Sequence, residues 1–134
     1  MNKKEIISFF DKMAPDWDSR LVVDIEKISF ILDRAGIKEN CTVLDVACGT
    51  GVLFPYYLRR NVSRVIGVDI SPNMTRLAVA KNRDVRVEVI CADIEELPVG
   101  PAALLQPPVP YSYPRRLLRL SSDPARSIRE CRIH

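Results

Sequence analysis

The pattern of apolar and polar positions predicts two helices in the first 40 residues. Apolar side chains recur at helical spacing over residues 4–13, so a short amphipathic helix is expected there. A second helix is predicted over residues 21–35, with Gly36 as its C-terminal cap. Its apolar stripe consists of Ile25, Ile28, Ile31, Leu32 and Ala35.

Three short runs rich in β-branched residues alternate with helical segments after residue 40. The runs cover residues 42–47, 64–68 and 85–91. Helices are predicted over residues 52–60 and up to about Asn82, the second with Ser71 as N-cap and Pro72 at its first position. Strands that alternate with helices at this pitch indicate βαβ units. The sequence therefore predicts an α/β fold with a Rossmann-like parallel sheet and flanking helices.

Candidate chemistry follows each of the three predicted strands. The first strand leads into a glycine loop that begins at Asp45 and ends at Gly51, the second ends at Asp69, and the third precedes Asp93 and Ile94. The carboxyl ends of parallel strands meet at one edge of a sheet, where ligands bind. Asp69 lies 24 residues after Asp45, and that offset suits an acid that accepts hydrogen bonds from ribose hydroxyls.

The loop does not fit a dinucleotide-binding fingerprint. Counted from Gly49, the position of the third glycine holds the bulky Phe54, which argues against close helix packing under a pyrophosphate. The sequence also has no phosphate loop of the G-x-x-x-x-G-K-[ST] type. Asp45, before the loop, would repel a pyrophosphate and instead favours a cationic ligand such as an ammonium or a sulfonium.

These residues resemble a known family, the class I S-adenosylmethionine-dependent methyltransferases. Val-Leu-Asp-Val-Ala-Cys-Gly-Thr-Gly at residues 43–51 resembles motif I of that family, and residues 65–74 and 92–98 look like its second-strand and third-strand segments. Residues 9–18 are similar to the lead-in of small methyltransferases of the ubiquinone/menaquinone-biosynthesis type. The resemblance covers about residues 9–98 and implies S-adenosyl-L-methionine as cofactor.

The resemblance also assigns cofactor-binding roles in the first loop. Gly49, Thr50 and Gly51 would pass against the cofactor, and Asp45 would help to hold its methionine end. Ala47 stands where the fuller motif has glycine. Alanine is tolerated at this position if its φ stays negative, so we interpret it as a mild variant of the motif.

Further roles implied by the resemblance fall after the second and third strands. Asp69 would bind both ribose hydroxyls, and Met74 would pack near the adenine. Asp93 would accept a hydrogen bond from the adenine amino group, with the backbone of Ile94 beside it. No catalytic residue is assigned. The acceptor is expected to be a small molecule, while a quinone-like ring, a protein or RNA stay open.

Composition changes abruptly near residue 98. Residues 1–98 hold 14 Lys and Arg against 15 Asp and Glu, whereas residues 99–134 hold six Arg, two acids and six of the ten prolines. The expected organisation is a partial cofactor-binding domain over 1–98, with helices over 1–40 and three βα units over 41–98. A Pro/Arg-rich, irregular tail then covers 99–134. The tail is either a flexible extension or the product of a shift in reading frame.

The tail offers no fourth strand. Residues 106–114 contain four prolines, none of which can donate a hydrogen bond to a ladder. We therefore expect the N-terminal half of the class I fold, truncated after its third strand. Catalysis would then be impaired, because the family's acceptor-binding walls come largely from the absent part. The first strand would present a bare edge that allows self-association.

Two alternatives compete with a methyltransferase. One is a nicotinamide-dependent oxidoreductase, which Phe54 disfavours. The other is a nucleic-acid-binding fragment that uses the arginine tail, which lacks interleaved aromatic residues. No apolar run approaches the ~20 residues of a membrane span, so we expect no membrane partner. Four cysteines without C-x-x-C or metal-ligand spacing, and without a secretory signal, favour the cytoplasm.

Overall fold

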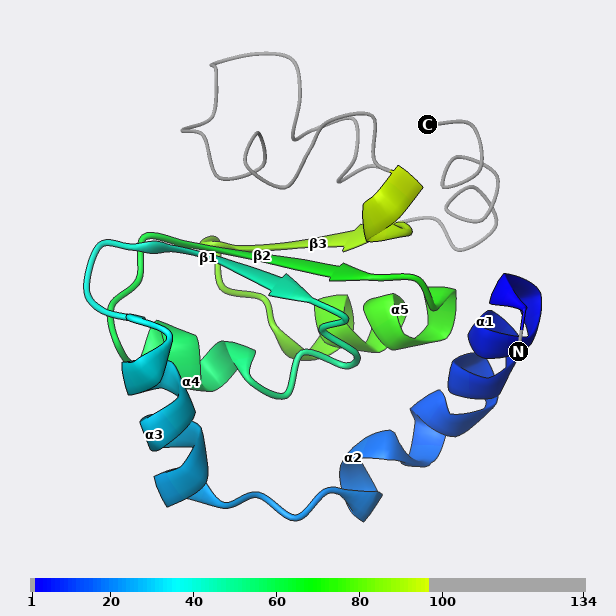
Figure 1. The fold of residues 1–134 in the computed structure, drawn as a ribbon, viewed down its shortest axis with the longest axis horizontal. Coiled ribbons are helices and arrows are strands. Elements are labelled where there is room, and N and C mark those ends of the chain that lie inside the picture. Colours follow the sequence, from blue (N-terminus) through cyan, green and yellow to red (C-terminus); the bar gives the residue numbers. More distant parts are fainter. Residues whose placement is uncertain (1, 97–134) are drawn as a thin grey trace.

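Three parallel strands form the centre of the molecule. The structure is a computed structural model that describes residues 2–96. Its strands are β1 (Thr42–Val46), β2 (Arg64–Asp69) and β3 (Val87–Cys91), in the order β1-β2-β3. All three point the same way, so their carboxyl ends meet at one edge (Figure 1). The predicted α/β fold with a Rossmann-like parallel sheet is confirmed.

Helices pack on one face of this sheet. Helices α4 (Phe54–Leu58) and α5 (Pro72–Lys81) lie beneath the strands in Figure 1. An apolar core on that side joins the strands to these helices through Val43, Val65, Val89, Phe54, Tyr57 and Ala78. A second apolar cluster contains Ile66, Val68, Ile90 and Ala92. Both faces of the strands are therefore apolar, as expected for a buried parallel sheet.

The N-terminal segment forms more helix than its sequence pattern predicts. Helix α1 (Lys3–Met13) is followed by the 3₁₀ turn η1 (Ala14–Asp16) and by the single-turn helix α2 (Trp17–Arg20). Asn2 and Glu5 make a capping box that fixes the start of α1. Helix α1 lies beside α5 (Figure 1), so the segment folds back toward the edge where the strands end.

Helix α3 (Ile25–Arg34) begins later than predicted. The side chain of Asp24 accepts a hydrogen bond from the backbone N–H of Lys27 at 3.1 Å, so Asp24 is the N-cap. The residues from 21 to 24 are not helical, and Val22 is 95% exposed. The predicted extension over residues 21–24 was wrong because the cap at Asp24 fixes the start of the helix, although the apolar pattern continues before it.

The predicted apolar stripe of α3 is only partly buried against the core. Leu32 is buried and Ile28 packs against the core, but Ile25 and Ile31 are exposed. The apolar spacing located the helix correctly and overestimated how much of its surface the described residues cover.

Two other predicted elements are shorter than their sequence patterns. The helix predicted over 52–60 is confined to Phe54–Leu58, and the strand predicted over 85–91 begins at Val87. Asp84 accepts hydrogen bonds from the backbone and the guanidinium of Arg86. This local turn competes with extension of the strand and leaves Val85 98% exposed.

Within the part of the chain that the structure describes, β1 pairs with β2 alone. Val46 at its end is 46% exposed. The predicted irregular tail, and the domain boundary at residue 98, lie outside the described residues. No helix among residues 2–96 is both long and apolar enough to cross a membrane.

Candidate functional site

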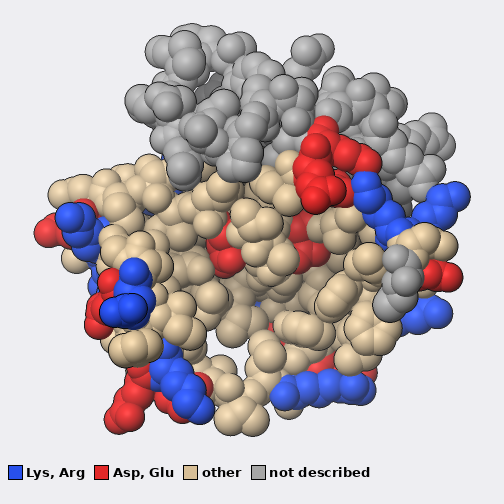
Figure 2. Space-filling view, viewed as in Figure 1, with Lys and Arg blue, Asp and Glu red and all other residues tan. Residues whose placement is uncertain are grey.

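A cleft of about 480 Å³ lies where the three strands end and where α1 and α2 approach the sheet. Six of the nine residues that the sequence predicts for cofactor binding line it, namely Ala47, Gly49, Asp69, Met74, Asp93 and Ile94. Figure 2 shows acidic atoms recessed near the middle of this face. The volume falls within the ~300–1,000 Å³ typical of small-molecule sites.

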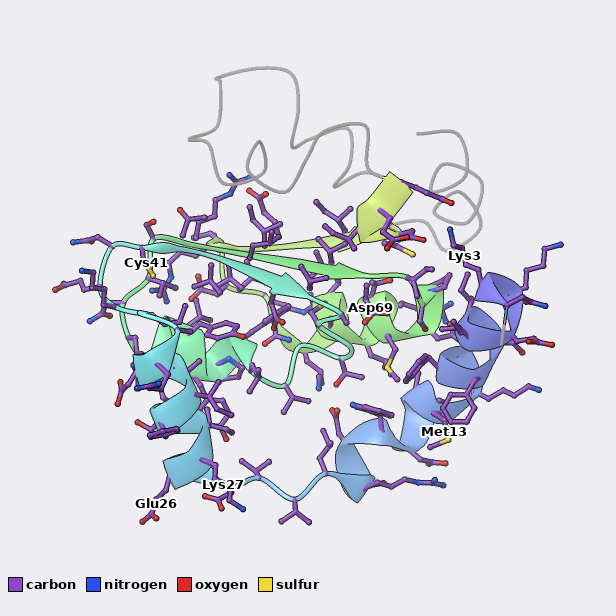
Figure 3. All side chains as sticks on the ribbon, viewed as in Figure 1. Lys3, Met13, Glu26, Lys27, Cys41 and Asp69 are labelled. Atoms are coloured by element: carbon purple, nitrogen blue, oxygen red, sulfur yellow. The ribbon has the colours of Figure 1, made fainter. Side chains whose placement is uncertain are left out.

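Asp69 connects the glycine loop after β1 to the start of α5, within the cleft. Figure 3 places it where the arrow of β2 ends. One carboxylate oxygen accepts the backbone N–H of Gly49 at 2.8 Å, and the other accepts the N–H of Ser71 at 2.9 Å. A carboxylate offers about four lone-pair positions. Each oxygen therefore keeps capacity for one further donor from a ligand.

Asp45 lies on the strand next to Asp69 but does not line the cleft itself. The Tyr57 hydroxyl donates to it at 3.2 Å. Burial raises the pKa of Asp45, and the nearby charge of Asp69 raises it further, against the opposing effect of the Tyr57 hydrogen bond. Burial and Asp45 likewise raise the pKa of Tyr57. The two carboxylates make this end of the sheet favourable for a cation.

The loop after β1 contains three residues with left-handed backbone conformation. Ala47 has φ 59°, Gly49 has φ 56° and Gly51 has φ 73°. The condition for a mild variant, a negative φ at Ala47, is therefore not met. A left-handed alanine is strained because its Cβ crowds the following carbonyl. The glycine of the fuller motif would carry no such strain at this position.

Thr50 and Gly51 turn away from the cleft. The Thr50 side chain is 1% exposed, and its hydroxyl donates to Asp18 at 2.5 Å. Gly51 lines a separate cavity of about 280 Å³ beside Asp18 and Lys81. The structure therefore brings six of the predicted residues together in the cleft, whereas Asp45, Thr50 and Gly51 do not line it.

Met74 lines the cleft from the first turn of α5, and Ser71 caps that helix. Met74 is 1% exposed and also lines the cleft, so it is both a core residue and a cleft wall. The Ser71 hydroxyl accepts the N–H of Met74 at 3.1 Å, as predicted for an N-cap. This cap fixes the first turn of α5 beside Asp69.

Asp93 closes the far end of the cleft through an ion pair with α1. Lys3 donates to Asp93 at 2.7 Å and also to Glu96. The Lys3 hydrogen bond and the N–H of Glu95 lower the pKa of Asp93. Figure 3 shows Lys3 at the end of α1 that faces the 3₁₀ turn η2 (Ile94–Glu96). Asp93 is therefore anionic and still exposes one side to the cleft.

The N-terminal segment supplies an aromatic wall of the cleft, although the sequence analysis predicted no site residue in this segment. Phe10 and Trp17 line the cleft, with their rings 5.9 Å apart in an edge-on arrangement. The Trp17 indole nitrogen lies 3.8 Å from where a Cβ on Gly49 would be. The similarity of residues 9–18 to a methyltransferase lead-in was the only sequence signal for this wall.

Cys48 is packed inside the loop after β1 and is buried. Its side chain is in the apolar core. Burial raises the pKa of its thiol, and the charges of Asp69 and Asp45 raise it further. The thiol therefore stays protonated, in keeping with a buried filler.

Comparison with protein families identifies the class. Residues 43–104 match the model of a family described as a methyltransferase domain. A malonyl-[acyl-carrier protein] O-methyltransferase of Acetivibrio thermocellus is 32% identical over 99 residues, which is 72% of this chain and 35% of that protein. A protein of the same name from Pseudescherichia vulneris is 28% identical over 76% of this chain and 39% of its own length.

Solved structures share the fold. The crystal structure of the [4+2]-cyclase SpnF superposes with a TM-score of 0.64 at 20% identity, over 74% of this chain and 45% of that one. A likeness at this identity establishes architecture and no reaction. The chain spans little more than a third of the length of the curated relatives described above.

Fold and sequence together define an α/β chain of the methyltransferase type. Residues 43–104 match a methyltransferase-domain family, and the chain is similar to S-adenosylmethionine-dependent methyltransferases, as the three motifs predicted. The cofactor of that family is S-adenosyl-L-methionine, as the resemblance implied, and its sulfonium is one of the two cations that Asp45 was predicted to favour.

Proposed function

We propose that this chain is the cofactor-binding part of a methyltransferase that moves a methyl group from S-adenosyl-L-methionine to a carboxylate oxygen of an acyl substrate. The observation that carries the proposal is the single cleft into which the ends of all three strands contribute predicted residues. The carboxylate acceptor is suggested by the relatives, which are named as malonyl-[acyl-carrier protein] O-methyltransferases.

The residues present fit the cofactor. The free lone pairs of Asp69 suit two ribose hydroxyls, since its two existing hydrogen bonds use only one position on each oxygen. Met74 and Ile94 offer apolar surface for a purine ring. Asp93 supplies an acceptor for an amino group at the same end of the cleft.

The negative charge at this end of the sheet favours a ligand with a positively charged sulfonium. Asp45 and Asp69 interact electrostatically at the ends of neighbouring strands. A positively charged ligand relieves this repulsion, whereas a pyrophosphate would increase it. The same argument disfavours the nicotinamide alternative, and the nucleic-acid alternative depends on a tail outside the described residues.

When bound, the cofactor supplies an electrophilic methyl group on a positively charged sulfur. A carboxylate acceptor is already a nucleophile, so its oxygen can bond to the methyl carbon while the carbon–sulfur bond breaks and its electron pair stays on sulfur. The products are a methyl ester and a neutral thioether, and no proton moves. The chain then needs to bind and orient its ligands rather than hold a base.

Titration calorimetry of the full chain with S-adenosylhomocysteine and S-adenosylmethionine tests cofactor binding. Asp69→Asn should weaken binding about 10- to 100-fold, because hydrogen bonds to a charged group are each worth ~1.5–3 kcal/mol. Glu39→Gln, an exposed acid outside the cleft, is the matched control. A folded wild-type chain that binds neither compound would refute the proposal.

The acceptor is tested separately with methyl-labelled cofactor. The chain is incubated with a malonyl-loaded acyl carrier protein and with malonyl-coenzyme A, and the label is followed into an alkali-labile ester. Label in either substrate supports a carboxylate acceptor, and the ratio distinguishes a carrier-bound substrate from a small molecule. Cofactor binding without transfer to either would reject this acceptor and leave the cofactor assignment intact.

A further inference from the structure

Three polar side chains join α2 to the glycine loop and to the end of α5. The Thr50 hydroxyl donates to one oxygen of Asp18 at 2.5 Å, and Lys81 donates to the other oxygen. Lys81 also donates to the Thr50 hydroxyl at 3.1 Å. We call Asp18, Thr50 and Lys81 the Asp18 latch. Its members come from three segments that no local sequence pattern connects.

The latch is buried on one side and open to solvent on the other. Thr50 is 1% exposed, whereas the side chains of Asp18 and Lys81 are 46% and 37% exposed. Burial acts to raise the pKa of Asp18, but the hydrogen bonds from Lys81 and Thr50 outweigh it and lower the pKa overall. Asp18 is thus anionic at neutral pH, and its half-exposed ion pair with Lys81 can separate without opening the core.

The residue next to Asp18 is the aromatic wall of the cleft. Trp17 and Asp18 belong to the same single-turn helix, and the chain is not helical from residue 21 to residue 24. The Trp17 indole lies beside Gly49, directly before Thr50 in the loop. Whatever holds Asp18 on Thr50 therefore also holds the Trp17 ring beside Gly49.

A second attachment lies at the other end of this segment. Asp11 of α1 accepts from the Ser71 hydroxyl at 2.5 Å and from the N–H of Asn73 at 3.0 Å. These contacts are independent of the latch. Opening the latch would therefore release α2 and Trp17 while α1 stays attached to α5.

We propose that Asp18 is a positioning residue that holds α2 closed on the glycine loop and so keeps Trp17 as a wall of the cofactor cleft. The effect on cofactor affinity rests on the function proposed above. The position of Trp17 does not, and it can be measured in the free protein. The closed arrangement is the binding-competent one, so loss of the latch lowers apparent affinity by lowering the competent fraction.

The free protein gives a direct readout, because Trp17 is the only tryptophan in the sequence. Acrylamide quenching of its fluorescence should increase, and its emission should shift to the red, in Asp18→Asn and in Lys81→Met. Asp16→Asn is the matched control, since this exposed acid lies two residues away and its side chain has no polar contact with residues 2–96. Far-UV circular dichroism verifies that each variant is folded.

The second readout is affinity for S-adenosylhomocysteine. Asp18→Asn and Lys81→Met should each weaken binding about twofold to fivefold, the range expected when a half-exposed ion pair controls the competent fraction. Asp16→Asn should bind like the wild type. Saturating S-adenosylhomocysteine should return Trp17 quenching in Asp18→Asn to the wild-type level.

Two results would overturn the proposal. One is quenching in folded Asp18→Asn and Lys81→Met that equals quenching in Asp16→Asn. The other is greater quenching with unchanged affinity, which would show that the latch moves Trp17 without affecting the cleft. If the wild type binds no S-adenosylhomocysteine, the proposed function fails, and the quenching comparison still decides whether Asp18 positions Trp17.

Discussion

The ring of Phe54 occupies the space that a side chain on Gly67 would need. A Cβ on Gly67 would lie 2.4 Å from Cζ of Phe54 and 2.9 Å from Sγ of Cys48. In a dinucleotide-binding loop, the helix carries the small residue that permits close helix–strand packing. Here the small residue is Gly67 on β2, and the helix carries Phe54 in its place. Phe54 therefore packs into the core from the position where a dinucleotide-binding loop has its third glycine.

Gly67→Ala should destabilise the chain. Phe54 is fully buried, so its ring cannot move aside freely, and such overpacking costs about 1–3 kcal/mol. Chemical denaturation monitored by circular dichroism measures the change in the free energy of unfolding. In the double variant Gly67→Ala/Phe54→Leu, the two losses should be less than additive. Full additivity would show that the ring and the glycine do not share this space.

Ala47→Gly should stabilise the chain or leave it unchanged. The left-handed conformation of the alanine destabilises the folded wild-type chain by about 1–2 kcal/mol. Replacement by glycine removes this strain, but the greater entropy of glycine in the unfolded chain offsets about 0.5–1 kcal/mol of the gain. Urea unfolding should therefore give a gain between zero and about 1.5 kcal/mol. Ala80→Gly in α5 is the control with the opposite sign, at a loss of ~1 kcal/mol. A similar loss at Ala47 would contradict the strain.

The pH dependence of stability should change in Asp45→Asn. Burial raises the folded-state pKa of Asp45 above its ordinary 3.8, so the folded chain binds this proton more tightly than the unfolded chain. The unfolding free energy of the wild type should then fall, relative to Asp45→Asn, as pH rises from below 3.8 through the folded pKa. Denaturant unfolding across this range measures it, with Asp16→Asn as the charge control. A constant difference would refute the raised pKa.

Asp11→Ala should loosen α1 from α5. The Asp11 carboxylate caps the first turn of α5 from another helix, and loss of charge-assisted hydrogen bonds to Ser71 and Asn73 costs about 1–3 kcal/mol. Hydrogen exchange should accelerate at the Asn73 amide before it does in β2. Asp11→Asn keeps one acceptor oxygen and should be intermediate. Equal protection in all three proteins would refute the capping role.

The strands and the position of the site could be predicted because both depend on local signals. β-branched runs mark each strand, and Asp69 and Asp93 follow them directly in the sequence. Parallel strands bring such residues to one edge, so spacing along the chain becomes proximity in space. The N-cap at Ser71 was predictable for the same reason, since the capping pattern is complete within four residues.

Other parts depend on contacts that no local pattern contains. Asp18 and Lys81 are 63 residues apart, and nothing in either neighbourhood indicates the other. The sign of φ at Ala47 could not be predicted either. Alanine favours a negative φ, and only the surrounding loop, held by the hydrogen bond from Gly49 to Asp69, imposes the opposite value.

The attachment of α1 has a consequence for the order of events during synthesis on a ribosome. Helix α1 leaves the exit tunnel before α5, and its partners Ser71 and Asn73 follow Asp11 by about 60 residues. Until they emerge, the apolar side chains of Ile6 and Phe10, which line the cleft in the folded chain, have no docking place. The part of the cleft wall that is translated earliest is thus the part that reaches its final position last.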